Sequence, residues 1–252
     1  MKLSNRLQQI HDQIPEGSRL ADIGSDHALL PVAAIRSGQA VSAIAGEVNP
    51  GPYDAASKQV SDAGLQSQIT VRRGDGLDVI TAGEVDVITI AGMGGALIAS
   101  ILDRGISKLE GVQLLILQPN VGEDILRRWL LQHQWVVVAE QLLEEDGKIY
   151  EIITAMPQGS SPITNEEVYR ARPLQGDVEL TEDLLLRMGP YLVDRATDVF
   201  FAKWESEILK LQSVVQSISK SDQDSSRDKA AEVEQLIMSL KEVLACLPKV
   251  KP

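Results

Sequence analysis

Apolar residues along the first two thirds of the chain follow two alternating patterns. Short runs rich in Val and Ile are typical of buried strands, and the segments between them repeat their apolar positions every three to four residues, as helices do. The sequence predicts strands at residues 20–23, 43–46, 69–71, 85–91, 113–117 and 135–140, and helices at residues 5–14, 27–36, 52–63, 96–104 and 123–132. Ser4 is the predicted N-cap of the first helix. Strands that are apolar on both faces indicate a mostly parallel sheet covered by helices on both sides.

The last predicted sheet element has a different pattern. The stretch WVVVAEQLLEEDGKIYEIITAMP, residues 135–157, has two apolar runs around Asp146 and Gly147. Asp-Gly between two such runs is a strong signal for a tight β-hairpin. An antiparallel hairpin that closes a mostly parallel α/β sheet resembles the Rossmann-like sheet of class I methyltransferases. Dinucleotide-binding folds do not usually end in this way.

A change of composition near residues 157–162, where Gly, Ser and Pro cluster, indicates a domain edge. We predict a first domain at residues 1–157 and a helical second domain at residues 158–252. Two apolar stripes in the second domain recur at helical spacing: Phe200 or Phe201, Trp204, Ile208, Leu211, Val215 and Ile218, then Val233, Leu236, Leu240, Val243 and Leu247. They could form a core against the first domain. Because each stripe is narrow, we favour a projecting, coiled-coil-like antiparallel helical hairpin.

Candidate chemistry begins in LADIGSDHALLP, residues 20–31, where a strand passes into a helix through Gly24. Dinucleotide-binding turns usually carry another glycine two positions later, so that the backbone can approach a pyrophosphate. Here that position is Asp26, and Asp22 ends the strand. Two carboxylates repel a pyrophosphate but favour the sulfonium and ammonium of S-adenosylmethionine. Asp26 could also serve as the N-cap of the next helix, and both roles can coexist.

Three more strand ends offer groups that suit the same cofactor, at Glu47, Asp75, Gly76, Ala91, Gly92 and Met93. The acid after the second strand can accept hydrogen bonds from ribose hydroxyls, and the acid after the third can accept one from an adenine amino group. Each could instead be an ordinary solvated acid or turn residue. Because the carboxyl ends of parallel strands share one sheet edge, the set points to a cofactor site more strongly than any member alone.

Seven segments together are similar to the bacterial tRNA (adenine-22) N1-methyltransferase family: LSNRL, ADIGSDHALLP, AIAGE, GDGL, ITIAGMGG, ILQPN and LEEDGKIYEI. The resemblance covers the whole chain. It implies a class I methyltransferase that uses S-adenosylmethionine and acts on the D-loop region of tRNA. It also implies that Arg6, within LSNRL, pairs with the cofactor carboxylate. Without the family motif, Arg6 would be read as a surface arginine.

The fourth strand is not followed by the Asn/Asp-Pro-Pro motif of many enzymes that methylate exocyclic amines. Adenine N1 carries its own lone pair, so alignment of the reactants is the main requirement. The ring becomes cationic during transfer, and Asp26 is our candidate to stabilise it. His27 is the candidate hydrogen-bonding partner or proton acceptor, and Asn120 could read the adenine edge. Alternatively, His27 is an early-helix histidine and Asn120 shapes a turn.

The net charge of −12 argues against nucleic acid as a partner. Residues 1–157 carry 12 Lys and Arg against 20 Asp and Glu, and residues 158–252 carry 12 against 16. Any tRNA footprint must therefore be a local patch. The candidates are Arg72 and Arg73, Arg127 and Arg128, Arg170 and Arg172, and Lys203 with Lys210.

The single cysteine, Cys246, excludes internal disulfides and fits a reducing compartment. No apolar run approaches the length of a membrane span, so we expect a cytoplasmic protein without membrane contact. We predict no metal site and favour a monomer. Three functions stay open: a tRNA adenine-N1 methyltransferase, a small-molecule methyltransferase of the same fold, and a non-enzymatic scaffold that uses the helical hairpin.

Overall fold

The computed structural model describes residues 3–218 and 224–250. By its internal contacts the chain divides into two compact units, Met1–Val168 and Tyr169–Pro252. The division lies after the change of composition at residue 157 that suggested the domain edge. Within the described residues, no helix is long and apolar enough to cross a membrane.

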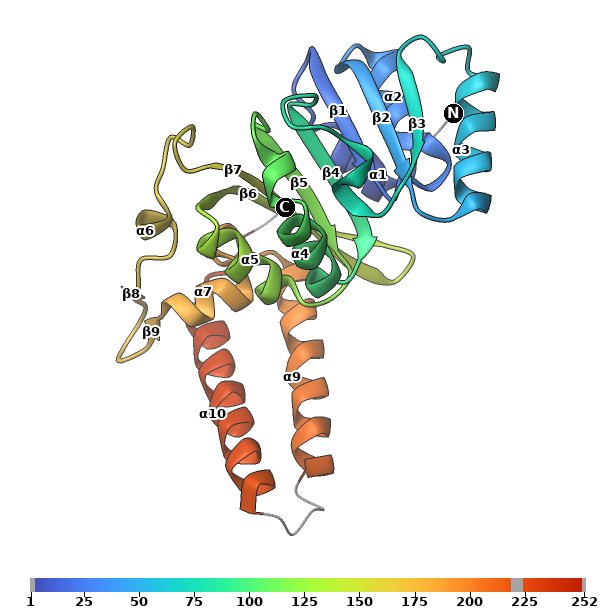
Figure 1. Cartoon of the computed structure of the whole chain (residues 1–252). Coiled ribbons are helices and arrows are strands. Elements are labelled where there is room, and N and C mark those ends of the chain that lie inside the picture. The colour runs from blue at the N-terminus through green and yellow to red at the C-terminus, as the bar shows by residue number, and fades with distance from the viewer. Residues whose placement is uncertain (1–2, 219–223, 251–252) are drawn as a thin grey trace. The chain divides into compact units, whose positions relative to one another are not determined.

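A seven-stranded sheet forms the centre of the first unit, with the order β3-β2-β1-β4-β5-β7-β6 (Figure 1). The strands are β1 (Ser18–Ile23), β2 (Ala40–Glu47), β3 (Ile69–Arg73), β4 (Val87–Met93), β5 (Leu114–Pro119), β6 (Trp135–Glu145) and β7 (Lys148–Pro157). Strands β1 to β5 pair in parallel, whereas β7 is antiparallel to both β5 and β6. The predicted mostly parallel sheet with a closing antiparallel hairpin is confirmed.

Asp146 and Gly147 form the hairpin turn between β6 and β7. Both have positive φ, 51° and 69°, and Glu145 pairs with Lys148 across the turn. A two-residue turn with two positive φ angles matches the twist of the flanking strands, and Asp-Gly adopts it at low cost. The local sequence is therefore sufficient to place this turn.

Helices pack around the sheet in two groups. The helices of the first unit are α1 (Asn5–His11), α2 (Leu29–Ser37), α3 (Pro50–Asp62), α4 (Gly95–Arg104), α5 (Glu123–Gln132) and α6 (Asn165–Val168), with short 3₁₀ turns η1 (Asp26–Ala28), η2 (Gly76–Val79) and η3 (Ile106–Leu109). Helix α2 contacts both α1 and α3, and α4 contacts α5. One core cluster joins α1 and α2 to the sheet through Ile10, Leu20, Leu30, Ile116 and Ile152.

Most of the predicted helices differ from the structure by one to three residues at their ends, as the first two illustrate. The first begins with Ser4 as predicted, whose hydroxyl accepts a hydrogen bond from the Leu7 amide, but it ends at His11 rather than residue 14. The second begins at Leu29 instead of residue 27. Asp26, His27 and Ala28 have φ angles of 30°, 63° and 53°, in the left-handed region that the right-handed helix excludes.

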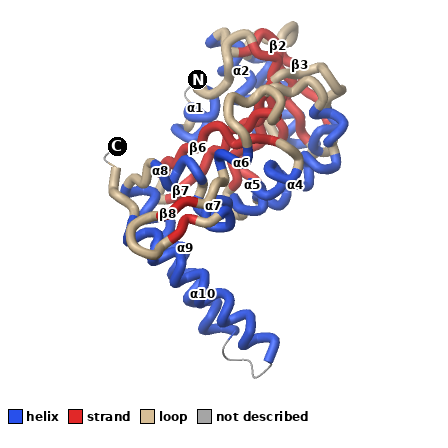
Figure 2. Tube along the Cα trace, turned by 90° about the vertical axis from the view of Figure 1, so that its left-hand side faces the viewer, coloured by secondary structure: helices blue, strands red, loops and turns tan. Residues whose placement is uncertain are grey.

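The second unit consists mainly of helices. Its elements are β8 (Arg172–Pro173), β9 (Glu179–Leu180), α7 (Glu182–Met188), α8 (Pro190–Asp194), α9 (Asp198–Ile218) and α10 (Asp224–Cys246). Helices α9 and α10 lie side by side (Figures 1 and 2). The predicted stripes contribute buried residues such as Trp204, Ile208, Leu240 and Val243. The helical hairpin is thus confirmed, while its projection from the first unit stays a prediction.

Arg127 is buried, contrary to its prediction as part of an RNA-binding patch. Its side chain on α5 is fully inaccessible, and Nε donates to Glu140 Oε1 at 2.6 Å. Nη2 also pairs with Glu151 on β7, whose side chain is 1% exposed. The guanidinium therefore joins α5 to the β6–β7 hairpin and cannot meet a phosphate. A buried cation between two carboxylates costs desolvation energy, which their hydrogen bonds offset only while the set is complete.

Replacing Arg127 by Met should lower the free energy of unfolding by about 3–5 kcal/mol, because it leaves two buried carboxylates without their cation. Urea denaturation near neutral pH measures the change. Arg128→Met, on the same helix but half-exposed, is the matched control and should cost less than about 1 kcal/mol. An equal fall in the free energy of unfolding in the two variants would show that the buried ion pairs of Arg127 do not stabilise the fold more than a surface arginine does.

Candidate active site

A cavity of about 360 Å³ lies in the first unit where β1 and β4 are neighbours. The strand order reverses between these two strands, and such a switch point is the usual ligand site of open α/β sheets. The cavity is lined by Arg6, Leu7, Asp22, Gly24, Ser25, Asp26, Leu29, Leu30, Ala91, Gly92, Met93, Asn120 and Tyr150. Most of the predicted site residues are among them. His27, Glu47, Asp75 and Gly76 are not.

Asp22 is a buried carboxylate at the end of β1 and is 5% exposed. The hydroxyls of Ser25 and Thr89 donate hydrogen bonds to its two oxygens, each at 2.6 Å. Burial raises the pKa of Asp22 to about 6, although both hydroxyls favour the ionised form. A buried carboxylate with a raised pKa is stabilised by a cation placed beside it. A positively charged ligand group beside Asp22 would therefore favour its ionised form.

Gly24 turns the chain from β1 toward the cavity. Its φ is 72°, and a Cβ at this position would lie 2.3 Å from Met93 Cε. A side chain would therefore be strained by the backbone and would collide with the end of β4. The positive φ is the stronger constraint, because the Met93 side chain could move aside.

Asp26 lies in the left-handed turn with its side chain 85% exposed. Its amide donates to Glu47 Oε1 at 2.8 Å, which links the turn to the end of β2. Burial raises the pKa of Glu47, and the hydrogen bond from the Asp26 amide opposes this shift. The alternative of Asp26 as an N-cap is wrong, because α2 follows Ala28 and has no side-chain cap. The exposed His27 ring has Nε2 3.5 Å from Asp26 Oδ1.

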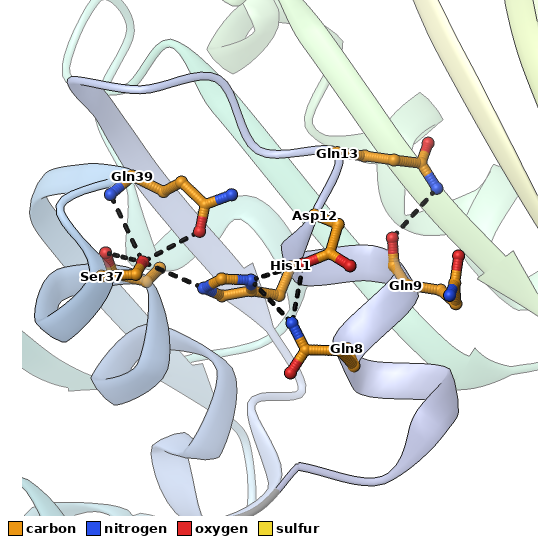
Figure 3. Close-up of polar contacts among 8 residues, drawn as sticks. Gln8, Gln9, His11, Asp12, Gln13, Ser37 and Gln39 are labelled. Atoms are coloured by element: carbon orange, nitrogen blue, oxygen red, sulfur yellow. Dashed lines mark hydrogen bonds and ion pairs between the residues drawn. The ribbon is translucent and has the colours of Figure 1, made fainter.

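Helix α1 carries Arg6 and is fastened at both ends. At its start, the Asn5 amide donates to Glu145 Oε1 at 2.5 Å. At its end, the His11 ring lies between Asp12 and Ser37 of α2, with Nδ1 3.1 Å from Asp12 Oδ1 and Nε2 3.0 Å from Ser37 Oγ (Figure 3). These contacts hold the helix that presents Arg6 to the cavity.

The Arg6 guanidinium lies against two groups at the cavity. It stands 5.3 Å from the centre of the Tyr150 ring, which also lines the cavity. Its Nη1 donates to Gln118 Oε1 at 2.6 Å. The contact with the aromatic ring and the hydrogen bond to Gln118 together restrict the position of the guanidinium. Tyr150 and Gln118 were not predicted as site residues, although both occur in segments that carry the family resemblance.

Asn120, predicted to read an adenine edge, is itself bound within the chain. Its Nδ2 donates to the Gly92 carbonyl at 2.8 Å, and its Oδ1 accepts from Gln118 Nε2 at 3.1 Å. Its backbone amide donates to the Met93 carbonyl at 2.7 Å. The side chain is thus oriented at the cavity wall before any substrate binds.

Asp75 and Gly76 have partners outside the cavity. The Asp75 carboxylate pairs with Arg104 of α4 at 2.7 Å, and this guanidinium lowers the pKa of Asp75. A Cβ on Gly76 would lie 2.9 Å from Ile101, so the glycine allows close packing against α4. Contacts of these two residues with an adenine ring stay predictions.

A larger cavity, of about 690 Å³, lies within the second unit. Carboxylates such as Asp177, Glu179 and Glu232 line it, and none of the predicted site residues does. Its charge repels phosphate, so we do not assign it to a nucleic acid. Among the described residues, no group of three or more His, Cys, Asp or Glu side chains could hold a metal ion.

The chain is similar to proteins of one enzyme family. The family model "tRNA (adenine(22)-N(1))-methyltransferase" matches residues 20–242. The tRNA (adenine(22)-N(1))-methyltransferase of Bacillus subtilis is 44% identical to this chain, over 97% of this chain and 98% of its own length. The crystal structure of the B. subtilis m1A22 tRNA methyltransferase matches with a TM-score of 0.86, over 96% of this chain and 98% of that one. A putative tRNA (m1A22) methyltransferase of Streptococcus pneumoniae, solved in complex with S-adenosyl-L-methionine, is 39% identical with a TM-score of 0.79, over 96% of this chain and all of that one.

The raised pKa of Asp22 makes stability depend on pH. Between the ordinary value of 3.8 and about 6, the folded protein binds more protons at Asp22 than the unfolded chain does. The contribution of Asp22 to the free energy of unfolding therefore falls as pH rises through this window, and Asp22→Asn removes it. Urea denaturation should show the variant gaining about 2 kcal/mol relative to wild type between about pH 4.5 and 7.5.

The exposed Asp54 on α3 is the matched control. Asp54→Asn should change the free energy of unfolding by less than about 0.5 kcal/mol at either pH. A difference between Asp22→Asn and wild type that stays constant with pH would contradict the raised pKa.

Proposed function

Since the chain belongs to the tRNA (adenine(22)-N(1))-methyltransferase family, we propose that it transfers a methyl group from S-adenosylmethionine to N1 of adenine 22 in tRNA. One observation supports this most strongly: a cavity at the switch point between β1 and β4, lined by Asp22, Asp26 and Arg6. Two carboxylates and a guanidinium in one small cavity match a ligand that carries both positive charge and a carboxylate.

The cavity fits S-adenosylmethionine better than a dinucleotide. Its volume of about 360 Å³ lies within the range of small-molecule sites. The buried Asp22 suits the ligand's cationic end, whereas a pyrophosphate beside Asp22 and Asp26 would be repelled. Arg6 can bind a carboxylate with two parallel hydrogen bonds. Glu47 accepts a hydrogen bond from the amide of Asp26, which lines the cavity. We assign Glu47 as the acceptor for the ribose hydroxyls.

The bound cofactor supplies an electrophilic methyl group on a sulfonium. Adenine N1 would attack the methyl carbon with its own lone pair while the bond from that carbon to sulfur breaks, and the cofactor would leave as neutral-sulfur S-adenosylhomocysteine. No base has to remove a proton before the N–C bond forms. The adenine ring becomes cationic as that bond forms. A fixed carboxylate beside the ring stabilises this charge more than it stabilises the neutral substrate, and this difference lowers the barrier.

We assign the stabilising carboxylate to Asp26. The side chain is exposed in the free protein, where water weakens its field. A bound nucleotide would cover it and strengthen the interaction. His27, 3.5 Å away, is assigned as its hydrogen-bonding partner or as a proton acceptor. Asn120 is assigned to the adenine edge, because its amide already has a fixed orientation.

The tRNA has to present an unpaired adenine, since N1 is hidden in a base pair. We propose that the D-loop region supplies it and that local basic groups hold the surrounding phosphates. Several candidates are engaged elsewhere: Arg72 with Glu84, and Arg172 with Asp194. Lys203 and Lys210 on α9 are the candidates that we test, because the Lys210–Glu207 pair lies at the surface and costs little to break. The substrate also implies that the protein works in the cytoplasm.

The decisive test is mass spectrometry of nucleosides from tRNA incubated with the purified protein and S-adenosylmethionine. We expect 1-methyladenosine to appear in tRNA with adenine at position 22 and to be absent when that position is guanine.

Replacing both Lys203 and Lys210 by Glu should weaken tRNA binding and make it less salt-dependent, with cofactor affinity unchanged. Unmodified tRNA together with turnover of a small-molecule acceptor would favour the alternative methyltransferase.

The role of Asp26 can be isolated with Asp26→Asn. Asn tolerates positive φ as well as Asp does, so the turn should keep its shape while the charge is lost. We expect the single-turnover rate of methyl transfer to fall by about a hundredfold or more at saturating cofactor. Calorimetric measurement of cofactor affinity is the control. A rate that recovers at saturating cofactor would assign Asp26 to the cofactor's ammonium, and a wild-type rate under all conditions would remove it from the site.

A further inference from the structure

A β-bulge interrupts the end of β4 next to the cavity. Ala91 pairs with Gln118 of β5 and Met93 pairs with Pro119, so the pairing skips Gly92. Gly92 has a φ of 78°, and its backbone groups lie outside the ladder. A bulge leaves such groups to be satisfied by other partners, because unpaired backbone groups are costly.

Two side chains from the end of β5 provide those partners. Gln118 Oε1 accepts a hydrogen bond from the Gly92 amide at 3.1 Å. Asn120 Nδ2 donates to the Gly92 carbonyl at 2.8 Å. The bulge at the cavity wall therefore depends on two side-chain amides rather than on strand pairing.

Gln118 makes four hydrogen bonds from a fully buried position. Its Oε1 accepts from Arg6 Nη1 and from the Gly92 amide, and its Nε2 donates to the Pro119 carbonyl and to Asn120 Oδ1. Guanidinium and backbone N–H groups can only donate, so the oxygen of Gln118 has to face Arg6 and Gly92. Its NH₂ then faces Asn120, which in turn directs the Asn120 NH₂ to the Gly92 carbonyl.

We propose that Gln118 is the positioning residue of this site and sets the orientation of both Arg6 and Asn120. The proposal rests on the proposed function, in which Arg6 binds the cofactor carboxylate and Asn120 reads the adenine. One buried amide thereby couples the cofactor end of the cavity to the substrate end. Asn120 keeps one N–H and one lone pair for the base, and Gln118 decides where each of them points.

Two effects separate this role from a merely structural one. Loss of the bond to Arg6 should weaken cofactor binding, and loss of the bond to Asn120 should slow methyl transfer even when cofactor is saturating. A residue that only stabilised the fold would lower the free energy of unfolding while leaving a folded enzyme with normal affinity and rate.

The test uses the full-length variant Gln118→Met, which preserves length but removes all four hydrogen bonds. We expect the dissociation constant for S-adenosylmethionine, measured by calorimetry, to rise about tenfold, as for a lost hydrogen bond to a charged group. The single-turnover rate at saturating cofactor should also fall at least tenfold. Gln141→Met is the matched control: it replaces a half-buried glutamine of β6, outside the cavity, and should leave both values within about twofold of wild type.

A second variant and a double-variant comparison keep the proposal testable if Gln118→Met folds poorly. Gln118→Glu can still accept from Arg6 but, when ionised, cannot donate to Asn120, so its rate at saturating cofactor should fall. In an Asn120→Ala background, Gln118→Met should lower that rate by less than about threefold, because the two residues act together.

The proposal would be overturned if folded Gln118→Met had normal cofactor affinity and a normal rate. It would also be overturned if Gln118→Met lowered the single-turnover rate as much in the Asn120→Ala background as it does in wild type. The wild-type reaction separates this result from a failure of the proposed function. If wild-type protein does not methylate tRNA, the proposed function fails whatever Gln118 does.

Discussion

The candidate active site depends on the burial of one carboxylate at the point where the strand order reverses. Asp22 gives up most of its hydration and receives only two hydroxyl hydrogen bonds in return. A buried carboxylate so placed resists ionisation, and a cation placed beside it would favour the ionised form. Arg6, the nearby guanidinium that lines the same cavity, is engaged by Gln118 and Tyr150 instead. This buried charge is the basis for our proposal that the cavity binds the cationic end of S-adenosylmethionine.

The turn after β1 and the end of β4 form two walls of this site, and each is held by hydrogen bonds to a neighbouring strand. Gly24 at the end of β1 and Gly92 at the end of β4 both have backbone angles that favour glycine. The turn after β1 continues through three left-handed residues, tied to β2 by Glu47. The bulge at the end of β4 is tied to β5 by Gln118 and Asn120. Each wall is fixed by polar side chains of a neighbouring strand, so the cavity is largely formed before ligands bind, which reduces the entropic cost of binding.

Much of this could be predicted from sequence because the signals are local. Apolar runs, glycine turns and the Asp146-Gly147 turn together indicate the sheet and its closing hairpin, and the strand-end rule brings most of the site residues to one edge. The roles of Gln118 and Arg127 could not be read in this way. Gln118 contacts Arg6, 112 positions away. The two carboxylates that pair with Arg127 lie on the next two strands, 13 and 24 positions along the chain, beyond the reach of helix or strand periodicity. Sequence patterns describe the neighbours of a residue along the chain, whereas burial depends on its neighbours in space.

The left-handed turn at residues 26–28 illustrates the same limit. Locally, Asp-His-Ala followed by two leucines favours a right-handed helix, and each left-handed residue costs roughly 1–2 kcal/mol. The structure offsets that cost with the hydrogen bond from the Asp26 amide to Glu47 and with the burial of Ala28. Glu47 is also the acceptor that we assign to the ribose, so a bound ribose would share a carboxylate with the backbone that carries Asp26. Under this assignment, one side chain would contact both the cofactor and the backbone of the carboxylate that we propose stabilises the adenine.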